Sequence, residues 1–372
     1  MKVPFGDIKT QYLNLKPEID DAIQSVIDKT AFVRGPFVSG FEQEYAQQHG
    51  VKHCIAVANG TDAIYVSLKA LGIGPGNEVI TTCCSWIATS EVITQTGAKI
   101  VFVDIEPDYY AIDPALIEAK ITSRTKAILP VHLYGQPADM DRIVALCKKH
   151  DLYLIEDCAQ AHFAEYKGTK VGTFGDMGTF SFYPGKNLGA YGDAGAIITN
   201  DDQLADKARM FANHGSLVKH QHEIEGINSR MDGIQAAVLS VKLPHIHKWN
   251  QQRYENAVYY NELLKDVEGI ITPAISSDVS HIFHLYVVRT EKRQQLQQHL
   301  KDCGISTGVH YPKPLPFLKA YEYLRGQPED FPVAYEYQDK ILSLPMYPEL
   351  QREQIEYVAK CIKEYLGESV KL

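Results

Sequence analysis

Residues 178–189 read Gly178-Thr179-Phe180-Ser181-Phe182-Tyr183-Pro184-Gly185-Lys186-Asn187-Leu188-Gly189. The apolar run Gly178–Phe182 predicts a buried strand, and the proline and glycines after it predict a tight turn. Lys186 lies in that turn, where glycines let the backbone approach a ligand closely. A lysine placed after an apolar strand can lose its proton readily and form a Schiff base with a carbonyl group. Because most lysines are surface charges, the surrounding segments must decide which reading applies to Lys186.

This strand is one of seven short apolar runs that alternate with helical patterns between about residues 53 and 199. Such alternation predicts β-α-β units and a mostly parallel sheet covered by helices on both faces. The predicted strands are His53–Ala58, Glu78–Thr82, Ile100–Val103, Ala127–Val131, Tyr153–Glu156, Gly178–Phe182 and Ala194–Thr199. The predicted helices in this region are Thr61–Leu71, Met140–His150 and Asp202–His214.

The pattern changes after about Leu243. A long polar helix is predicted over Pro244–Val267, followed by a strand at Ile282–Arg289 and further alternation of helices and strands. A chain of 372 residues usually forms more than one hydrophobic core. We therefore expect a large domain over residues 1–243 and a smaller C-terminal α/β domain over residues 244–372. The first 20 or so residues could pack with either domain.

Composition excludes several classes of protein. The formal net charge of −9 and the lack of a basic run disfavour nucleic-acid binding. No segment has the roughly 18 apolar residues of a membrane helix, and the N-terminus does not resemble a secretion signal, so a cytoplasmic protein is expected. The seven cysteines include no C-x-x-C pair and are expected to be reduced. The pairs His245/His247 and His220/His222 lack further clustered ligands, so no metal site is predicted.

Ligands bind beyond the carboxyl ends of the strands in open parallel sheets, so polar residues after each strand are candidate site residues. The segment Asn59-Gly60-Thr61-Asp62 follows the first strand and precedes an apolar helix, where helix amides favour an anion such as phosphate. Simple helix capping without a ligand explains the same residues. Gly72-Ile73-Gly74-Pro75-Gly76 precedes a strand and lacks the G-x-G-x-x-G spacing, and no Walker motif is present, so NAD and ATP are not expected.

Two further junctions carry candidate residues. Asp157, in Glu156-Asp157-Cys158-Ala159-Gln160, follows an apolar strand and could hold a ring nitrogen protonated, or could cap the next helix. Trp86, in Ser85-Trp86-Ile87-Ala88-Thr89, could stack on a planar ring or pack in the core. Ser181, at the end of its strand, could donate to a phosphate.

The order of these features (Asn-Gly-Thr, an aromatic residue, Asp-x-x-Gln, Ser-x-x-x-x-Lys) resembles the DegT/StrS family of nucleotide-sugar aminotransferases, which depend on pyridoxal 5′-phosphate (PLP) and have the aspartate-aminotransferase-like fold. The likeness covers nearly the whole chain. It extends from Phe41-Glu42 through Gly226-Ile227-Asn228-Ser229-Arg230-Met231-Asp232 to Val309-His310-Tyr311-Pro312. The resemblance implies a seven-stranded, mostly parallel sheet in the large domain.

The family's site residues map onto this chain one by one. The resemblance implies that Lys186 binds the cofactor covalently, that Asp157 pairs with the pyridine nitrogen and that Gln160 lies beside the ring hydroxyl. It likewise implies phosphate contacts from Gly60, Thr61 and Ser181, and ring stacking by Trp86. Asn228 matches a residue that the neighbouring subunit supplies to the phosphate, so a homodimer with shared sites is implied. The resemblance places Arg230, His310 and Tyr311 where the sugar nucleotide approaches.

The implied reaction moves an amino group from L-glutamate to a nucleotide-linked keto sugar, in amino-sugar biosynthesis for surface glycans or glycosides. Relatives that carry histidine in place of the lysine catalyse dehydration or deoxygenation, so Lys186 favours transamination. The stretch from Tyr183 to Asp193 resembles relatives that act on dTDP- or UDP-linked 3-keto sugars, although Ala194 replaces a common glycine. A 4-keto sugar aminotransferase, a dehydratase of the same fold and a non-catalytic regulator that binds a sugar nucleotide remain alternatives.

Overall fold

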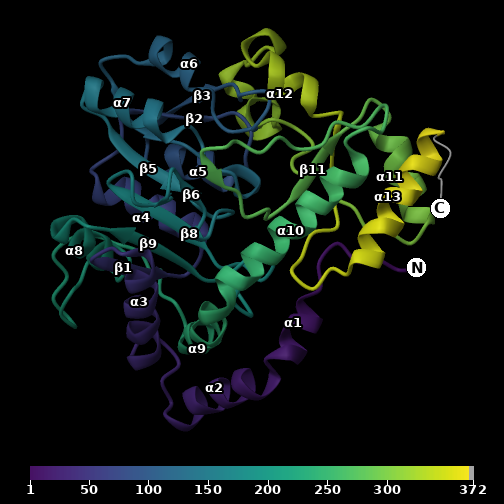
Figure 1. The fold of residues 1–372 in the computed structure, drawn as a ribbon. Helices are drawn as coiled ribbons and strands as arrows, with labels where there is room; N and C mark the ends of the chain where they lie inside the picture. The colour runs from purple at the N-terminus through teal and green to yellow at the C-terminus, as the bar shows by residue number, and fades with distance from the viewer. Residues whose placement is uncertain (368–372) are drawn as a thin grey trace.

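The computed structural model describes residues 1–367, and its main feature is a seven-stranded sheet with the strand order β1-β9-β8-β5-β4-β2-β3 (Figure 1). The strands are β1 (His53–Val57), β2 (Glu78–Thr82), β3 (Lys99–Val103), β4 (Thr125–Leu129), β5 (Tyr153–Asp157), β8 (Met177–Ser181) and β9 (Gly195–Thr199). Strand β9 runs antiparallel to both of its neighbours, and the other neighbouring strands are parallel. The predicted α/β class and mostly parallel seven-stranded sheet are confirmed.

Helices cover both faces of this sheet because alternate strand residues are apolar on each side. In β4, Ala127 and Leu129 join the core on one face, whereas Ile128 joins the core on the other. The first face is covered by α4 (Gly60–Ala70), α5 (Ala88–Gln95) and α8 (Asp202–Phe211). The opposite face is covered by α3 (Pro36–His49), α7 (Met140–His150) and α9 (Gly233–Lys242).

Some element ends differ from the predictions for local reasons. The helix predicted over Asp202–His214 ends at Phe211, because His214 adopts a left-handed φ of 56° and donates its backbone N–H to Ile227 O at 2.9 Å. The strand predicted at Ile282–Arg289 begins at Tyr286. Its first predicted residue, Ile282, donates its N–H to Gly135 O at 3.1 Å and so does not pair within the sheet of the C-terminal part.

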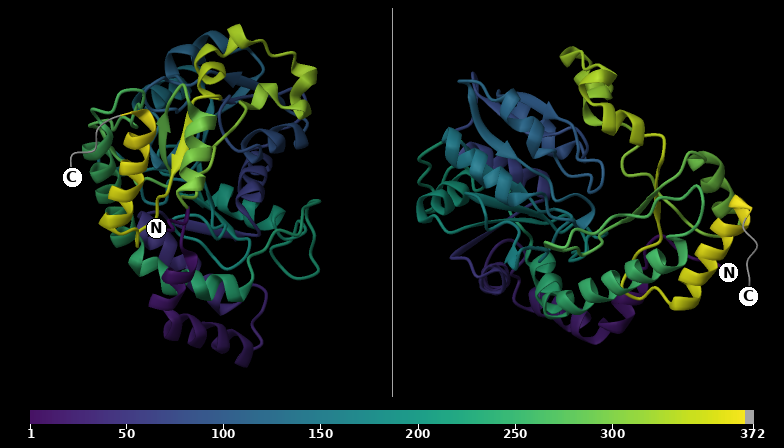
Figure 2. Two further views of the ribbon diagram at one scale, coloured as in Figure 1. Left: turned by 90° about the vertical axis from the view of Figure 1, so that its right-hand side faces the viewer. Right: turned by 45° about the horizontal axis from the view of Figure 1, so that its top comes forward.

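The C-terminal part is built on α10 (Ile246–Leu264), which leads away from the large sheet toward α11 (Arg293–Asp302) and α13 (Arg352–Leu366) (Figure 2). Strands β11 (Tyr286–Arg289) and β12 (Ile341–Leu344) pair antiparallel here. Val3 packs in the core of this part, whereas Ile19 of α2 (Lys16–Asp28) packs with residues of α9. The domain boundary at residue 243 stays a prediction.

The remaining elements are short. They are α1 (Ile8–Asn14), α6 (Pro114–Ile117), α12 (Pro332–Tyr337), β6 (Glu165–Tyr166), β7 (Thr169–Lys170) and β10 (Val279–Ser280), with six 3-10 turns at Glu118–Lys120, Leu133–Gly135, Leu243–His245, Leu315–Phe317, Lys319–Leu324 and Pro328–Asp330. Strands β10, β6 and β7 form a small sheet that the sequence did not predict. Within residues 1–367, no helix combines the length and apolarity needed to cross a membrane.

Candidate active site

A cavity of about 740 Å³ lies at the carboxyl ends of the parallel strands. Its wall is formed partly by residues that directly follow β1, β2 and β5, as expected for an open α/β sheet. Nine of the predicted site residues line it: Gly60, Thr61, Trp86, Asp157, Gln160, Ser181, Lys186, His310 and Tyr311. The fold therefore brings together residues that are up to 251 positions apart in the sequence, from Gly60 to Tyr311.

One end of the cavity is formed by the first turn of α4. Asn59 caps this helix, since its side-chain oxygen accepts a hydrogen bond from the Asp62 N–H at 2.8 Å. Gly60 lies so close to β8 that a Cβ atom on it would be 2.5 Å from the Cβ of Ser181. The first amides of a helix have no partner within the helix and favour an anion. Gly60, Thr61 and Ser181 therefore lie together at an end of the cavity where the start of α4 favours an anion, and we call these three residues the cradle.

Asp157 lies at the end of β5 and is buried. Its two carboxylate oxygens accept hydrogen bonds from the Thr89 hydroxyl at 2.8 Å and the Ala159 N–H at 3.1 Å. The Ser85 hydroxyl in turn lies 2.8 Å from that of Thr89. Burial raises the pKa of Asp157, and the two hydrogen bonds and the positive charge of Lys186 oppose this effect. The carboxylate is thus held in one orientation in a place where a cationic partner stabilises it.

Lys186 projects from the turn after β8 and is half-buried in the cavity wall. Burial lowers the pKa of its amine to about 8, and the negative charge of Asp157 limits the decrease. At pH 7 about a tenth of the amine is then uncharged, far more than for an ordinary lysine, and the uncharged form is the one that a nucleophile or proton acceptor requires. The next residue anchors the turn, because Asn187 Nδ2 donates to Asn250 Oδ1 at 2.9 Å and to Ile282 O at 3.2 Å.

Gln160, Tyr311 and Trp86 form a neighbouring wall. The Tyr134 N–H donates to Gln160 Oε1 at 2.7 Å, and Gln160 Nε2 donates to the Tyr311 hydroxyl at 3.1 Å. The ring of Trp86 lies 5.7 Å from that of Tyr311 and is 58% exposed, so Trp86 does not pack in the core. The Tyr134 hydroxyl donates to the backbone oxygen of His310. These contacts attach the segment around residue 310 to the large sheet.

Several residues of the site were not identified from the sequence. His162 Nε2 donates to the backbone oxygen of Ser181 at 2.9 Å, and the Tyr45 hydroxyl lies 3.1 Å from His162 Nδ1. Burial lowers the pKa of His162 to about 3, so this histidine is neutral and fixes the position of Ser181. Thr89 lies within a segment that was singled out, but Tyr134 and His162 carry no local motif that indicates their partners.

Asn228 and Arg230 do not line this cavity within one chain. Asn228 is exposed and forms an isolated β-bridge with Asn213. Arg230 lines a separate cavity of about 210 Å³ together with Arg34 and Arg209. The roles that the family resemblance implies for both residues stay predictions.

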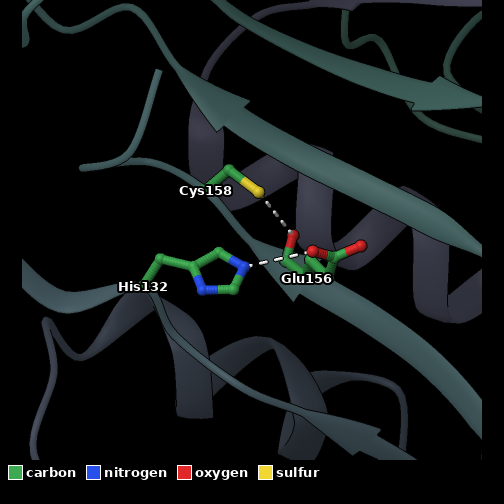
Figure 3. A group of neighbouring side chains, drawn as sticks. All are labelled: His132, Glu156 and Cys158. Atoms are coloured by element: carbon green, nitrogen blue, oxygen red, sulfur yellow. Dashed lines mark hydrogen bonds and ion pairs between the residues drawn. The ribbon is translucent and has the colours of Figure 1, made fainter. Parts of the chain in front are cut away.

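Behind the site, His132, Glu156 and Cys158 lie close together and are buried (Figure 3). The Ala138 N–H donates to His132 Nδ1 at 3.1 Å, so Nε2 carries the proton and donates to Glu156 Oε2 at 3.1 Å. Glu156 also accepts three backbone N–H groups, those of Gly172, Phe174 and Gly175. Burial raises the pKa of the Cys158 thiol well above its ordinary value, which disfavours the thiolate that binds metals. The cluster is therefore a hydrogen-bonded support for β5.

The chain is similar to proteins of known name over nearly its full length. It is 47% identical to a protein of Geobacillus stearothermophilus named pleiotropic regulatory protein, with 98% of this chain and 99% of the relative covered. It is 43% identical to the dTDP-3-amino-3,4,6-trideoxy-alpha-D-glucose transaminase of Streptomyces venezuelae, with 98% and 96% covered. The X-ray structure of S. venezuelae DesV in complex with a ketimine intermediate superposes with a TM-score of 0.97 at 43% identity, covering all of both chains.

The family model of the DegT/DnrJ/EryC1/StrS aminotransferases matches residues 14–363. That range includes Lys186, Asp157 and every other residue predicted for the site. The chain therefore belongs to the DegT/DnrJ/EryC1/StrS aminotransferase family.

Proposed function

We propose that this protein is a PLP-dependent aminotransferase that transfers an amino group from L-glutamate to a nucleotide-linked 3-keto sugar, in amino-sugar biosynthesis. The observation that carries the proposal is the arrangement of Lys186, Asp157 and the start of α4 around one cavity. An amine of lowered pKa, a buried carboxylate and an anion cradle are the groups that PLP requires of a protein. Family membership and the 43% identical sugar transaminase support the same reaction.

The residues present fit PLP. The cradle of Gly60, Thr61 and Ser181 would hold the phosphate, because a side chain on Gly60 would fill it. Asp157 would hold the pyridine nitrogen protonated, and Gln160 would lie beside the ring hydroxyl. When bound, PLP supplies a reactive aldehyde and a ring that accepts electrons.

Lys186 has two tasks in this proposal. Its uncharged amine would hold the cofactor, and when this amine is free its Nζ would take a proton from the α-carbon of the amino donor and deliver a proton back. A pKa of about 8 suits both directions of this transfer near neutral pH. Asp157 stabilises positive charge opposite Lys186, and Thr89 keeps the Asp157 carboxylate in place.

The choice of a 3-keto sugar with a dTDP or UDP group rests on two observations. The segment from Tyr183 to Asp193 resembles that of 3-keto enzymes, and the similar Streptomyces venezuelae enzyme is named for a dTDP-3-amino sugar. His310 and Tyr311 line the cavity and are proposed to contact the sugar nucleotide. A 4-keto sugar is the alternative substrate on the same scaffold.

The proposal includes a cytoplasmic homodimer in which Asn228 and Arg230 act on the partner's site. Both residues lie outside the cavity of their own chain, as a contribution across an interface requires. All seven cysteines are free, which suits a reducing compartment.

Absorption spectroscopy of the PLP-loaded protein tests the proposal. Adding L-glutamate should replace the absorption of the lysine-bound cofactor with that of its aminated form, and adding the keto sugar should reverse the change. Borohydride treatment followed by peptide mass spectrometry should label Lys186, and the Lys186→Ala variant should show neither the label nor the spectral change. Labelling of another lysine would refute the assignment.

A regulatory role is a second candidate, because the 47% identical relative is named as a pleiotropic regulatory protein. The same titration separates the two functions. A protein that binds PLP or a nucleotide sugar but whose spectrum does not respond to any amino donor would be a binder and not an aminotransferase.

A further inference from the structure

His284 lines the active-site cavity. It belongs to none of the segments that were predicted to form the site, and it has no role in the reaction proposed above. It lies between Ile282 and the start of β11, on the segment that the C-terminal part of the chain contributes to the cavity wall. Its side chain is half-buried. Among the charges that act on it, that of Lys186 is the strongest. The imidazole therefore belongs to the neighbourhood where the chemistry occurs.

The hydrogen bonds of Asn187 determine which nitrogen of His284 carries the proton. Asn187 Nδ2 lies 3.2 Å from Ile282 O, and a backbone carbonyl can only accept, so the amide nitrogen of Asn187 is identified. The other amide atom, Oδ1, can only accept, and it lies 3.1 Å from His284 Nδ1. Nδ1 must therefore be the donor. In a neutral imidazole this leaves Nε2 without a proton and with a free lone pair.

The surroundings keep this imidazole neutral. Burial lowers the pKa of His284 well below its ordinary value, and the positive charges of Lys186 and Arg253 act in the same direction. Among the residues that the structure describes, Nε2 has no hydrogen-bond partner. His284 thus presents a fixed hydrogen-bond acceptor at the cavity wall.

Two other acceptor side chains of the site already have hydrogen-bond partners. Gln160 Oε1 accepts the Tyr134 N–H, and both oxygens of Asp157 accept hydrogen bonds from neighbouring residues. A keto sugar brings hydroxyl groups, which need acceptors when they leave water. We propose that His284 Nε2 accepts a hydrogen bond from a hydroxyl group of the keto sugar, which makes His284 a specificity-determining residue and Asn187 its positioning residue. The identity of the ligand rests on the proposed function, whereas the fixed tautomer does not.

Nitrogen-15 NMR of the protein without cofactor, labelled at its histidine rings, tests the tautomer. The signal of His284, assigned by its loss in His284→Gln, should show Nδ1 protonated and Nε2 bare. His281 is a control on the same segment, because the Phe283 N–H donates to its Nδ1 at 3.0 Å and so requires the opposite tautomer. Asn187→Ala should remove the preference at His284 but not at His281. A protonated Nε2 at His284 in the wild-type protein would overturn the proposal, whatever the enzyme's activity.

The two half-reactions, measured separately, test the ligand. His284→Leu should raise KM for the keto sugar about tenfold, the effect of one lost hydrogen bond, and should leave the half-reaction with L-glutamate unchanged. For the wild-type enzyme, a substrate analogue that lacks the bonded hydroxyl should have a KM about tenfold higher than that of the full substrate. For His284→Leu, the analogue and the full substrate should have the same KM. If His284→Leu slows both half-reactions equally, or if its KM for the keto sugar is unchanged, His284 does not bind the sugar. If the wild-type protein does not react with glutamate at all, the proposed function fails, while the tautomer measurement still decides the state of His284.

Discussion

Lys186 and Asp157 affect each other's ionisation in the cavity. Burial disfavours the charge on both groups, and each charge partly offsets the cost of burying the other. The lysine pKa of about 8 results from this balance. Replacing either residue should therefore change the protonation of the other, which a purely structural role would not require.

Asp157→Asn should lower the pKa of Lys186 below about 8 in the cofactor-free protein, because the variant removes the negative charge that favours the protonated amine. Attachment of PLP should then reach its full rate at lower pH than in the wild type. Turnover should fall by about 10²-fold or more, because a neutral amide cannot hold the pyridine nitrogen protonated. Attachment rates and kcat measured from pH 6 to pH 10 check both effects.

Thr89→Val is the matched control for that experiment. It removes the hydroxyl that bonds to Asp157 but keeps the carboxylate charge. The pH dependence of attachment should stay close to that of the wild type, with a smaller loss of turnover. An unchanged pH profile in Asp157→Asn would show that Asp157 does not act on Lys186.

Single residues of the site could be predicted where they follow a strand within one segment. Lys186, Asp157 and Gly60 are of this kind, since the end of a parallel strand is a position that the sequence pattern reveals. The role of His284 could not be predicted, because its proton position depends on Asn187, which is 97 residues away in the chain. For Trp86 the sequence allowed either stacking on a planar ring or packing in the core, and the exposure of its side chain in the structure excludes packing in the core.

At the scale of elements, the contact between the start of α4 and the end of β8 decides the shape of the phosphate cradle. Gly60→Ala would place a Cβ atom 2.5 Å from that of Ser181 and force the two elements apart. We expect the free energy of unfolding to fall by about 1–3 kcal/mol and the Kd for PLP to rise at least about tenfold. Thermal unfolding without PLP and a PLP titration measure the two effects.

Gly40→Ala is the control, because no atom lies within 4 Å of the Cβ that it would introduce in α3. It should leave PLP binding unchanged and the protein equally stable or slightly more stable. If Gly60→Ala binds PLP as tightly as the wild type, the cradle is not the phosphate site.

The strands of the large sheet were predictable because each is a short apolar run between turn residues. Their order in the sheet was not, since it depends on long-range packing that no single run encodes. The predicted strand at Ala127–Val131 was placed two residues late, as β4 is Thr125–Leu129, although Val131 still forms an isolated parallel bridge with Asp157. The small sheet of β10, β6 and β7 was missed, since each of its strands has two residues.

At the scale of the whole molecule, the position of Asn228 outside its own cavity supports a shared site in a homodimer. Lys186→Ala and Asn228→Asp should each be inactive, the second because its charge repels phosphate. When the two variants are mixed and exchange subunits freely, half of the dimers are mixed and each has one intact site of two. Activity should then recover to roughly a quarter of the wild-type value.

Mixing Lys186→Ala with Asp157→Asn is the control, because both changes lie in the cavity of one chain and every site keeps a defect. This mixture should show no recovery beyond the activity of its components. If native mass spectrometry verifies mixed dimers and the Asn228→Asp mixture also fails to recover, Asn228 does not act across the interface.

The transfer of nitrogen-15 from labelled L-glutamate to a keto sugar tests whether this protein is an aminotransferase that depends on Lys186. The PLP-loaded protein would be incubated with the labelled donor and a dTDP-linked 3-keto sugar, with Lys186→Ala as the blank, and the sugar nucleotide analysed by mass spectrometry and NMR. We expect one nitrogen-15 bound to carbon 3 of the sugar in the wild-type reaction and none in the blank. Label that remains in glutamate while the keto sugar is unchanged, or the same incorporation by Lys186→Ala, would contradict this expectation.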